Sequence, residues 1–255
     1  MRSVLEVSEN GTEAEAAQVS APIVDISGAR FTWPGAKGFT LTIDAFSLQQ
    51  RERLLLIGPS GSGKSTFLSL LAGINVPAEG TISILGTDIA GLSSAARDHF
   101  RAEHMGIIFQ MFNLLPYGSV IDNVVLPLSF ASGRRRRIER MGAPEVEARR
   151  LLQSLGLGRE DYEGTAAASL SVGQQQRVAC ARALIGRPEL IIADEPTSSL
   201  DRDTQLAFLD LLFAEVQHEG GTLIMVSHDQ SLASRFDRAI RLDEIARTSR
   251  NGGTP

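Results

Sequence analysis

A glycine-rich segment directly after a short apolar run constrains the fold of this chain most. Residues 54–57 are apolar, and they are followed by Gly58, Pro59, Ser60, Gly61, Ser62, Gly63, Lys64, Ser65 and Thr66. A buried strand, a glycine loop and a helix start together let backbone N–H groups surround phosphate oxygens. Lys64 would add a positive charge, and Ser65 a hydroxyl ligand for Mg²⁺. A glycine-rich turn without a ligand explains neither side chain, so the sequence predicts a phosphate-binding loop.

Apolar patterns along the chain predict an α/β fold built on a mainly parallel sheet. Continuous apolar runs, which suit strands buried on both faces, occur at residues 54–57, 106–109, 190–193 and 222–226. Residues 39–46 alternate between apolar and polar, as a half-buried antiparallel strand requires. Helical patterns lie at residues 66–72 and 205–216. We therefore predict a doubly wound α/β core preceded by a small antiparallel β-subdomain.

The length of 255 residues predicts one α/β domain with additional segments around its core. Residues 1–20 are rich in Glu, Ala and Ser, which predicts a disordered leader. The domain is expected to cover residues 21–245, with an inserted α-helical subdomain at about 111–168 and a flexible tail at 246–255. The basic run from Arg134 to Arg137 is interpreted as a solvated surface, in preference to a contact for acidic lipid headgroups or a partner's acidic loop.

The composition argues against several other classes of protein. A net charge of -5 argues against nucleic-acid binding. No stretch approaches the roughly 20 apolar residues of a membrane helix, and the N-terminus lacks the pattern of a signal peptide. We therefore expect a cytoplasmic chain. The single cysteine, Cys180, lies in an apolar helical run and is interpreted as a buried structural thiol.

Two adjacent carboxylates, Asp194 and Glu195, end the apolar run at 190–193. Ligands of open α/β sheets collect at the C-terminal ends of the strands, where this run delivers both acids. Asp194 is expected to hold Mg²⁺ through water, and Glu195 to act as the general base for an attacking water. A helix cap or turn acid is the alternative, but it is the weaker one beside a phosphate-binding loop.

A second helix start with anion-binding character lies at Leu170, Ser171, Val172, Gly173 and Gln174. The Ser171 hydroxyl and the Gly173 N–H would both face an anion there, although Ser171 could also be only an N-cap. Here the chain resembles the ABC ATPase family. The family signature, Leu-Ser-Gly-Gly-Gln, binds the γ-phosphate of ATP held by the loop of the opposite subunit in a head-to-tail dimer. Val172 departs from that signature, at a position not expected to touch phosphate.

The resemblance implies roles for three further residues. Gln110, which ends an apolar strand, matches the glutamine that senses Mg²⁺ and the attacking water and passes the signal to a membrane subunit. Asp201 matches the loop that reaches across the dimer. His228 matches the histidine that contacts the γ-phosphate and orients Glu195. The implied cofactors are ATP and Mg²⁺, with Ser65, Gln110 and Asp194 as metal ligands.

The adenine platform is expected from the same resemblance to be Trp33. Phe31 points to the same face of the strand and is the alternative, since either ring could belong to the core. The Pro and Gly that follow Trp33 are typical of a turn and favour Trp33.

A narrower resemblance rests on residues 105–116 and 120–124, which look like the ATPases of lipoprotein-release, macrolide-export and cell-division systems. It implies an ATP-hydrolysing subunit that powers a membrane permease by export, lipoprotein release or mechanotransmission. Such a subunit dimerises with itself or a similar subunit when ATP is bound, and lies on the inner face of the membrane. A DNA-repair type would need long coiled coils between Gly63 and Leu170, where only about 105 residues are present. A regulatory scaffold, in which hydrolysis only resets a complex, stays open.

Overall fold

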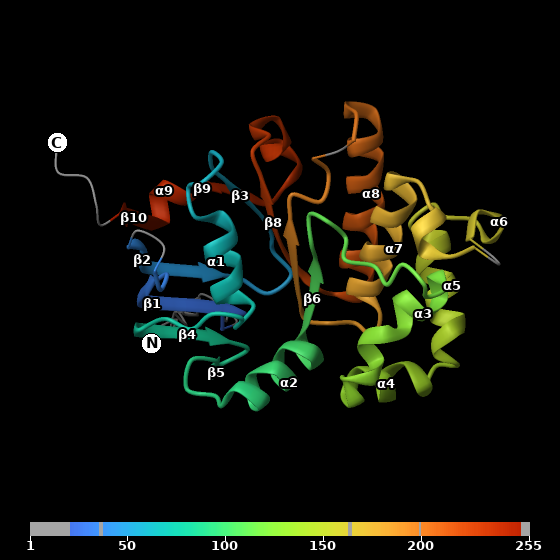
Figure 1. Cartoon of the computed structure of the whole chain (residues 1–255), viewed down its shortest axis with the longest axis horizontal. Coiled ribbons are helices and arrows are strands. Elements are labelled where there is room, and N and C mark those ends of the chain that lie inside the picture. The colour runs from blue at the N-terminus through green and yellow to red at the C-terminus, as the bar shows by residue number, and fades with distance from the viewer. Residues whose placement is uncertain (1–20, 36–37, 163–164, 199, 251–255) are drawn as a thin grey trace, which may run out of the picture.

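A computed structural model describes residues 21–35, 38–162, 165–198 and 200–250. The leader predicted for residues 1–20 lies outside the described residues. The described part of the chain contains two five-stranded sheets and the helices that surround them (Figure 1). None of the described helices has the length and apolar character needed to cross a bilayer.

The parallel sheet is the centre of the molecule and has the strand order β6-β7-β8-β3-β9. Its strands are β3 (Arg53–Ile57), β6 (Met105–Ile108), β7 (Leu190–Asp194), β8 (Thr222–Ser227) and β9 (Arg238–Arg241). In β3, Leu54 and Leu56 pack into the core on one face of the sheet, whereas Leu55 and Ile57 pack into the core on the other. Burial on both faces is the reason that this strand is a continuous apolar run.

The second sheet is antiparallel and has the order β10-β2-β1-β4-β5. It consists of β1 (Val24–Thr32), β2 (Phe39–Leu48), β4 (Glu79–Ile84), β5 (Thr87–Asp88) and β10 (Ala246–Arg250). Figure 1 shows it beside α1 (Lys64–Leu71), at the opposite side of the parallel sheet from α7 (Val172–Leu184) and α8 (Arg202–Glu219). The predicted α/β fold with a mainly parallel sheet and an antiparallel β-subdomain is confirmed.

Helices occupy the chain between β6 and β7, apart from a single bridge between Ser119 and Ala166 in the described residues. They are α3 (Val120–Val125), η1 (Leu126–Ser129), α4 (Ser132–Glu139), α5 (Pro144–Ser154), α6 (Arg159–Tyr162), η2 (Ala167–Ser169) and α7 (Val172–Leu184). Outside this segment lie α2 (Ser94–His104), α8 (Arg202–Glu219), η3 (Gln230–Arg235) and α9 (Leu242–Ile245). One face of the parallel sheet packs on α3, α5, α7 and α8, and the other packs on α1 and the antiparallel sheet.

The tail prediction is wrong for residues 246–250. These residues form β10, which pairs antiparallel with β2 from Ala246 opposite Ile43 to Arg250 opposite Phe39. The edge of β2 offers backbone N–H and C=O groups that need partners, and β10 satisfies them with little help from apolar side chains. Residues 251–255 lie outside the described residues.

The interpretation of the basic run as a solvated surface is wrong for Arg134 and Arg137. Arg134 is only 2% exposed, and it donates to the carbonyls of Ala102, Met105, Ala183 and Ile185. Arg137 donates to the carbonyl of Gly186 over 3.0 Å.

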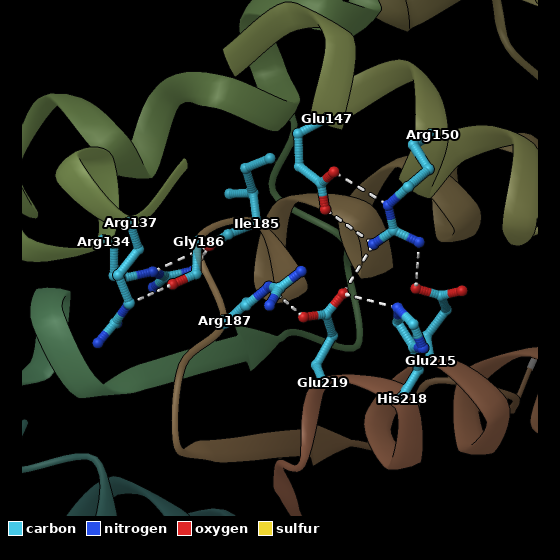
Figure 2. Close-up of polar contacts among 10 residues, drawn as sticks. All are labelled: Arg134, Arg137, Glu147, Arg150, Ile185, Gly186, Arg187, Glu215, His218 and Glu219. Atoms are coloured by element: carbon cyan, nitrogen blue, oxygen red, sulfur yellow. Dashed lines mark hydrogen bonds and ion pairs between the residues drawn. The ribbon is translucent and has the colours of Figure 1, made fainter. Parts of the chain in front are cut away.

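These contacts arise because a helix places residues three apart on one side, so that Arg134 and Arg137 both face the end of α7 (Figure 2). The last carbonyls of a helix lack helical partners and attract cations. Arg135 and Arg136, on the other side of α4, are exposed as predicted.

Candidate active site

A cavity of about 630 Å³ lies at the C-terminal ends of β3 and β7. The loop between β3 and α1 forms much of its wall. Its lining residues are Trp33, Phe39, Ser60, Gly61, Gly63, Lys64, Ser65, Thr66, Gln110, Asp194 and Glu195. Segments far apart in the sequence therefore meet at the edge where ligands of α/β sheets bind.

The glycine loop takes a shape that its residue types require. Gly63 precedes α1 with φ of 105°, a conformation that side chains rarely adopt, and a Cβ there would lie 3.2 Å from the ring of Phe39. Lys64 is 6% exposed, and its Nζ donates to the carbonyls of Gly58 over 2.8 Å and Pro59 over 3.0 Å. The loop thus bends over the Lys64 side chain and leaves the first N–H groups of α1 without helical partners.

Asp194 and Ser65 meet across the floor of the cavity. The Ser65 hydroxyl donates to Asp194 Oδ2 over 3.3 Å. The pKa of Asp194 is raised, first by burial and further by the charge of Glu195, while Ser65 and Lys64 act in the opposite direction. A carboxylate held in this way is stabilised by any cation that enters beside it.

Glu195 lies between two nitrogen donors. One carboxylate oxygen is 3.6 Å from Lys64 Nζ, and the other is 3.1 Å from His228 Nδ1. The backbone of Glu195 has φ of 45°, which is uncommon for a residue with a side chain and costs on the order of 1–3 kcal/mol. The turn after β7 is therefore held in a strained form that places this carboxylate between Lys64 and His228.

His228 follows β8 and is exposed, and its ring contacts the site at Glu195. It lines a neighbouring hollow of about 530 Å³ together with Ser198, Asp229 and residues around them. The histidine therefore lies where it can contact both Glu195 and a group that approaches from outside the molecule.

The structure distinguishes between the two candidate aromatic residues. Trp33 is 38% exposed and lines the cavity, and its indole N–H donates to the Thr66 hydroxyl over 3.1 Å. Phe31 is 8% exposed and packs edge-on against Trp33, with 5.2 Å between the ring centroids. Of these two rings, Trp33 lines the cavity and is available to a planar ligand, whereas Phe31 belongs to the core.

The second predicted anion site does not join the cavity. Ser171 caps α7, where its hydroxyl accepts from the N–H of Gln174 over 3.3 Å and the Gln174 side chain accepts from the N–H of Ser171 over 2.9 Å. Asp201 caps α8 with its carboxylate, which accepts from the N–H and the hydroxyl of Thr204, and these two hydrogen bonds lower its pKa. Ser171, Gly173, Gln174 and Asp201 are not among the residues that line the cavity. Ser171 is thus an N-cap in this structure, and it lies on a surface that another molecule can reach.

Three features of the site were not predicted from the sequence. Phe39 lines the cavity, although its place at the start of a strand gives no signal of this. The contact of Glu195 with Lys64 depends on how distant segments pack. Arg182 binds the loop after Gln110, and here a signal existed, because Arg182 interrupts an otherwise apolar helical run from Val178 to Leu184.

Comparison with known proteins agrees with the fold. A family model described as "ABC transporter" matches residues 41–198. The uncharacterized ABC transporter ATP-binding protein YbbA of Escherichia coli (strain K12) is 44% identical over 76% of this chain and 82% of its own length. The lipoprotein-releasing system ATP-binding protein LolD 1 of Caulobacter vibrioides is 42% identical over 84% of this chain and 86% of its own length.

Two further similar proteins extend the comparison. The macrolide export ATP-binding/permease protein MacB of Rhodopirellula baltica is 41% identical over 83% of this chain, and the chain spans only 29% of that relative's length. The solved dimeric cassette MJ0796, in a post-hydrolysis state bound to ADP and Pi, has a TM-score of 0.72 and 31% identity. The match covers 91% of this chain and 100% of that chain.

A phosphate-binding loop, two acids at a strand end and a mainly parallel sheet define an ATP-binding, ATP-hydrolysing cassette, as predicted. This chain belongs to the ABC transporter family.

Proposed function

We propose that this chain hydrolyses MgATP in a composite site built by two copies, and that the cycle drives a membrane permease. The observation that carries the proposal is the position of Glu195 between Lys64 and His228, beside the Ser65–Asp194 pair at one cavity. This arrangement supplies a base, a cation and a metal site where a γ-phosphate on the glycine loop would end.

The proposed binding of Mg²⁺ uses Ser65, Asp194 and Gln110. A hydroxyl, a carboxylate and an amide oxygen are the hard donors that Mg²⁺ takes together with water and phosphate oxygens, and these three residues line the same cavity. The hydrogen bond between Ser65 and Asp194 marks the two as close enough to share one ion. When bound, Mg²⁺ would neutralise charge on the β- and γ-phosphates.

The proposed chemistry is in-line attack of water on the γ-phosphate: the new P–O bond forms as the bond to the β-phosphate oxygen breaks, and ADP and phosphate leave. Glu195 accepts the proton of that water, and His228 orients the carboxylate through their 3.1 Å contact. Lys64 stabilises negative charge that spreads over the transferred group. The glycine-loop N–H groups of Gly61 to Thr66 hold the phosphates, and Trp33 stacks on the adenine.

The proposed second half of the site comes from another copy. Ser171, Gly173, Gln174 and Asp201 lie at helix N-termini outside the cavity, and Ser171 and Asp201 are exposed. A partner placed head to tail would bring its Ser171 and Gly173 to the γ-phosphate of the first copy. The dimeric state of the similar cassette MJ0796 supports this assignment.

The proposed permease would dock beside Gln110. Four large apolar side chains are exposed next to it and in the turns before α3 and after η1: Phe109, Met111, Tyr117 and Phe130. Phe109 and Phe130 line one hollow of the surface. Exposed apolar groups that gather in one region mark a protein contact. The relatives named for lipoprotein release and macrolide export support a permease of those types, which would hold this chain on the inner face of the cell membrane.

Removal of the Lys64 charge tests this function. Lys64→Ala should abolish ATP binding or turnover, because the loop N–H groups lose their main electrostatic partner at the phosphates. Calorimetry with MgATP and a phosphate-release assay would measure both, with Arg30→Ala as the control, since Arg30 pairs with Glu79 on the surface. Wild-type affinity and turnover in Lys64→Ala would overturn the proposal.

A further inference from the structure

The chain after Gln110 has an unusual backbone. Gln110 lies in a turn closed by a hydrogen bond from the N–H of Phe112 to the carbonyl of Phe109, over 3.0 Å. Phe112 and Asn113 follow with φ of 58° and 50°. Two consecutive residues with side chains in the left-handed region are strained, and such strain persists only where the surroundings hold it.

One side chain holds this strained segment. The Arg182 guanidinium donates to the carbonyl of Asn113 over 2.7 Å and to the carbonyl of Phe112. Arg182 is 9% exposed, and within the described part of the chain its hydrogen-bond partners are these two backbone carbonyls. A buried guanidinium makes strong directional bonds, so these two carbonyls are tightly placed.

Arg182 stands near the end of the helix that begins at the signature. Ser171 caps α7 at one end, and Arg182 lies about 16 Å along the same helix. Near Arg182, α7 packs closely on β6: a Cβ added to Gly106 would lie 2.2 Å from the Ala183 carbonyl. The loop after β6, which carries Gln110, is thus attached to α7 both by packing and by the two Arg182 hydrogen bonds.

We propose that Arg182 is a positioning residue for Gln110, which fixes the turn that carries this glutamine and ties it to the signature helix. The inference rests on the proposed role of Gln110 at the Mg²⁺ and the attacking water. A tilt of α7, when Ser171 and Gly173 meet a partner's nucleotide, would reach Gln110 through Arg182. Loss of Arg182 should therefore disturb the metal and water side of the site and spare the nucleotide-binding side.

A double-mutant cycle in the purified full-length chain tests the proposal. Arg182→Gln should lower turnover roughly tenfold and raise the Mg²⁺ concentration for half-maximal rate, while ATP affinity by calorimetry changes less than about twofold. In a Gln110→Ala background the same change should cost less than about twofold, because the residue it positions is gone. Arg182→Lys, which keeps the charge, should recover part of the rate. Additive effects in the cycle would overturn the inference.

Hydrogen exchange separates this inference from the proposed function. In Arg182→Gln, the N–H groups of residues 111–114 should exchange faster, whereas those of the glycine loop should not. Arg177→Gln is the matched control, since Arg177 lies on the same helix and donates to the carbonyl of Gly156. If Gln110→Ala leaves turnover unchanged, the role of Gln110 fails, but faster exchange at 111–114 would still support anchoring by Arg182. Unchanged exchange there would overturn it.

Discussion

At the scale of single residues, Trp33 offers the most direct test of the nucleotide pocket. The indole ring lines the cavity and is fixed by its hydrogen bond to Thr66. Trp33→Ala should weaken ATP binding by about 1–3 kcal/mol, the range of aromatic stacking on a base, as measured by calorimetry. Phe31→Leu is the control, because it should lower stability and not affinity. Unchanged affinity in Trp33→Ala would mean that the adenine binds elsewhere.

Asp194 links the site to the pH dependence of stability. Its pKa is raised, chiefly by burial, so the folded state holds the proton more tightly than the unfolded state does. Its contribution to stability is therefore fully present below its ordinary pKa and is lost as the pH rises through its folded pKa. At pH 7 the charged form destabilises the fold.

Asp194→Asn should therefore stabilise the fold and abolish turnover. Without nucleotide and metal, its Tm at pH 7 should exceed that of the wild type by on the order of 2 °C. The difference should shrink as the pH falls towards about 4, while turnover is lost at every pH. Thermal unfolding across this pH range measures it, and a variant with no gain at pH 7 would contradict the account.

Which parts of the site could be predicted from the sequence depends on how far apart along the chain the interacting residues lie. Lys64 and Ser65 could be placed because the loop follows its strand directly, and Asp194 because parallel strands share one end. The contact of Glu195 with His228 was expected from the family resemblance alone. The strained backbone of Glu195 and its contact with Lys64 could not be predicted, because tertiary packing brings these residues together.

At the scale of elements, α4 shows that one basic run can contain two kinds of arginine. Arg134→Met should destabilise the fold by on the order of 3 kcal/mol or more, because it leaves buried carbonyls in α2, β6 and α7 without donors. Arg135→Met should change stability by only about 0.5 kcal/mol, since Arg135 pairs on the surface with Glu139. Urea unfolding of both variants measures the free energy of unfolding, and equal losses in the two would contradict the buried role of Arg134.

The same region ties α5 to α8. Arg150 on α5 pairs with Glu215 over 3.2 Å and Glu219 over 2.8 Å, both on α8, and Arg187 in the loop after α7 also pairs with Glu219 (Figure 2). The loop from Ile185 to Arg187 is therefore held by α4 on one side and α8 on the other. This loop leads into β7, which carries Asp194.

Elements were predictable where apolar side chains define them. Four parallel strands, β3, β6, β7 and β8, are largely apolar runs because both of their faces are buried. Strand β10 was missed because its residues are largely polar and its pairing with β2 uses the backbone. The buried contacts of Arg134 and Arg137 were missed because a run of arginines gives no sign of which side chains will face backbone carbonyls in the folded chain.

At the scale of the whole molecule, the proposed composite site requires two copies. The cavity holds the loop, the acids and Gln110, whereas Ser171 and Gly173 lie at a separate helix start. ATP bound to one copy would be covered by the signature of the other, so ATP should favour the dimer by mass action. Hydrolysis would release that contact.

The decisive measurement is the mass in solution of Glu195→Gln with and without MgATP, by light scattering. This change keeps the shape of Glu195 but removes the base, so ATP should bind while hydrolysis falls roughly 10²–10⁴-fold. This variant should be a monomer without nucleotide and a dimer with ATP. Adding Ser171→Arg should abolish the dimer and leave ATP bound, since the bulky cation blocks only the partner's site. A Glu195→Gln protein that binds ATP yet stays monomeric at high concentration would contradict the composite site.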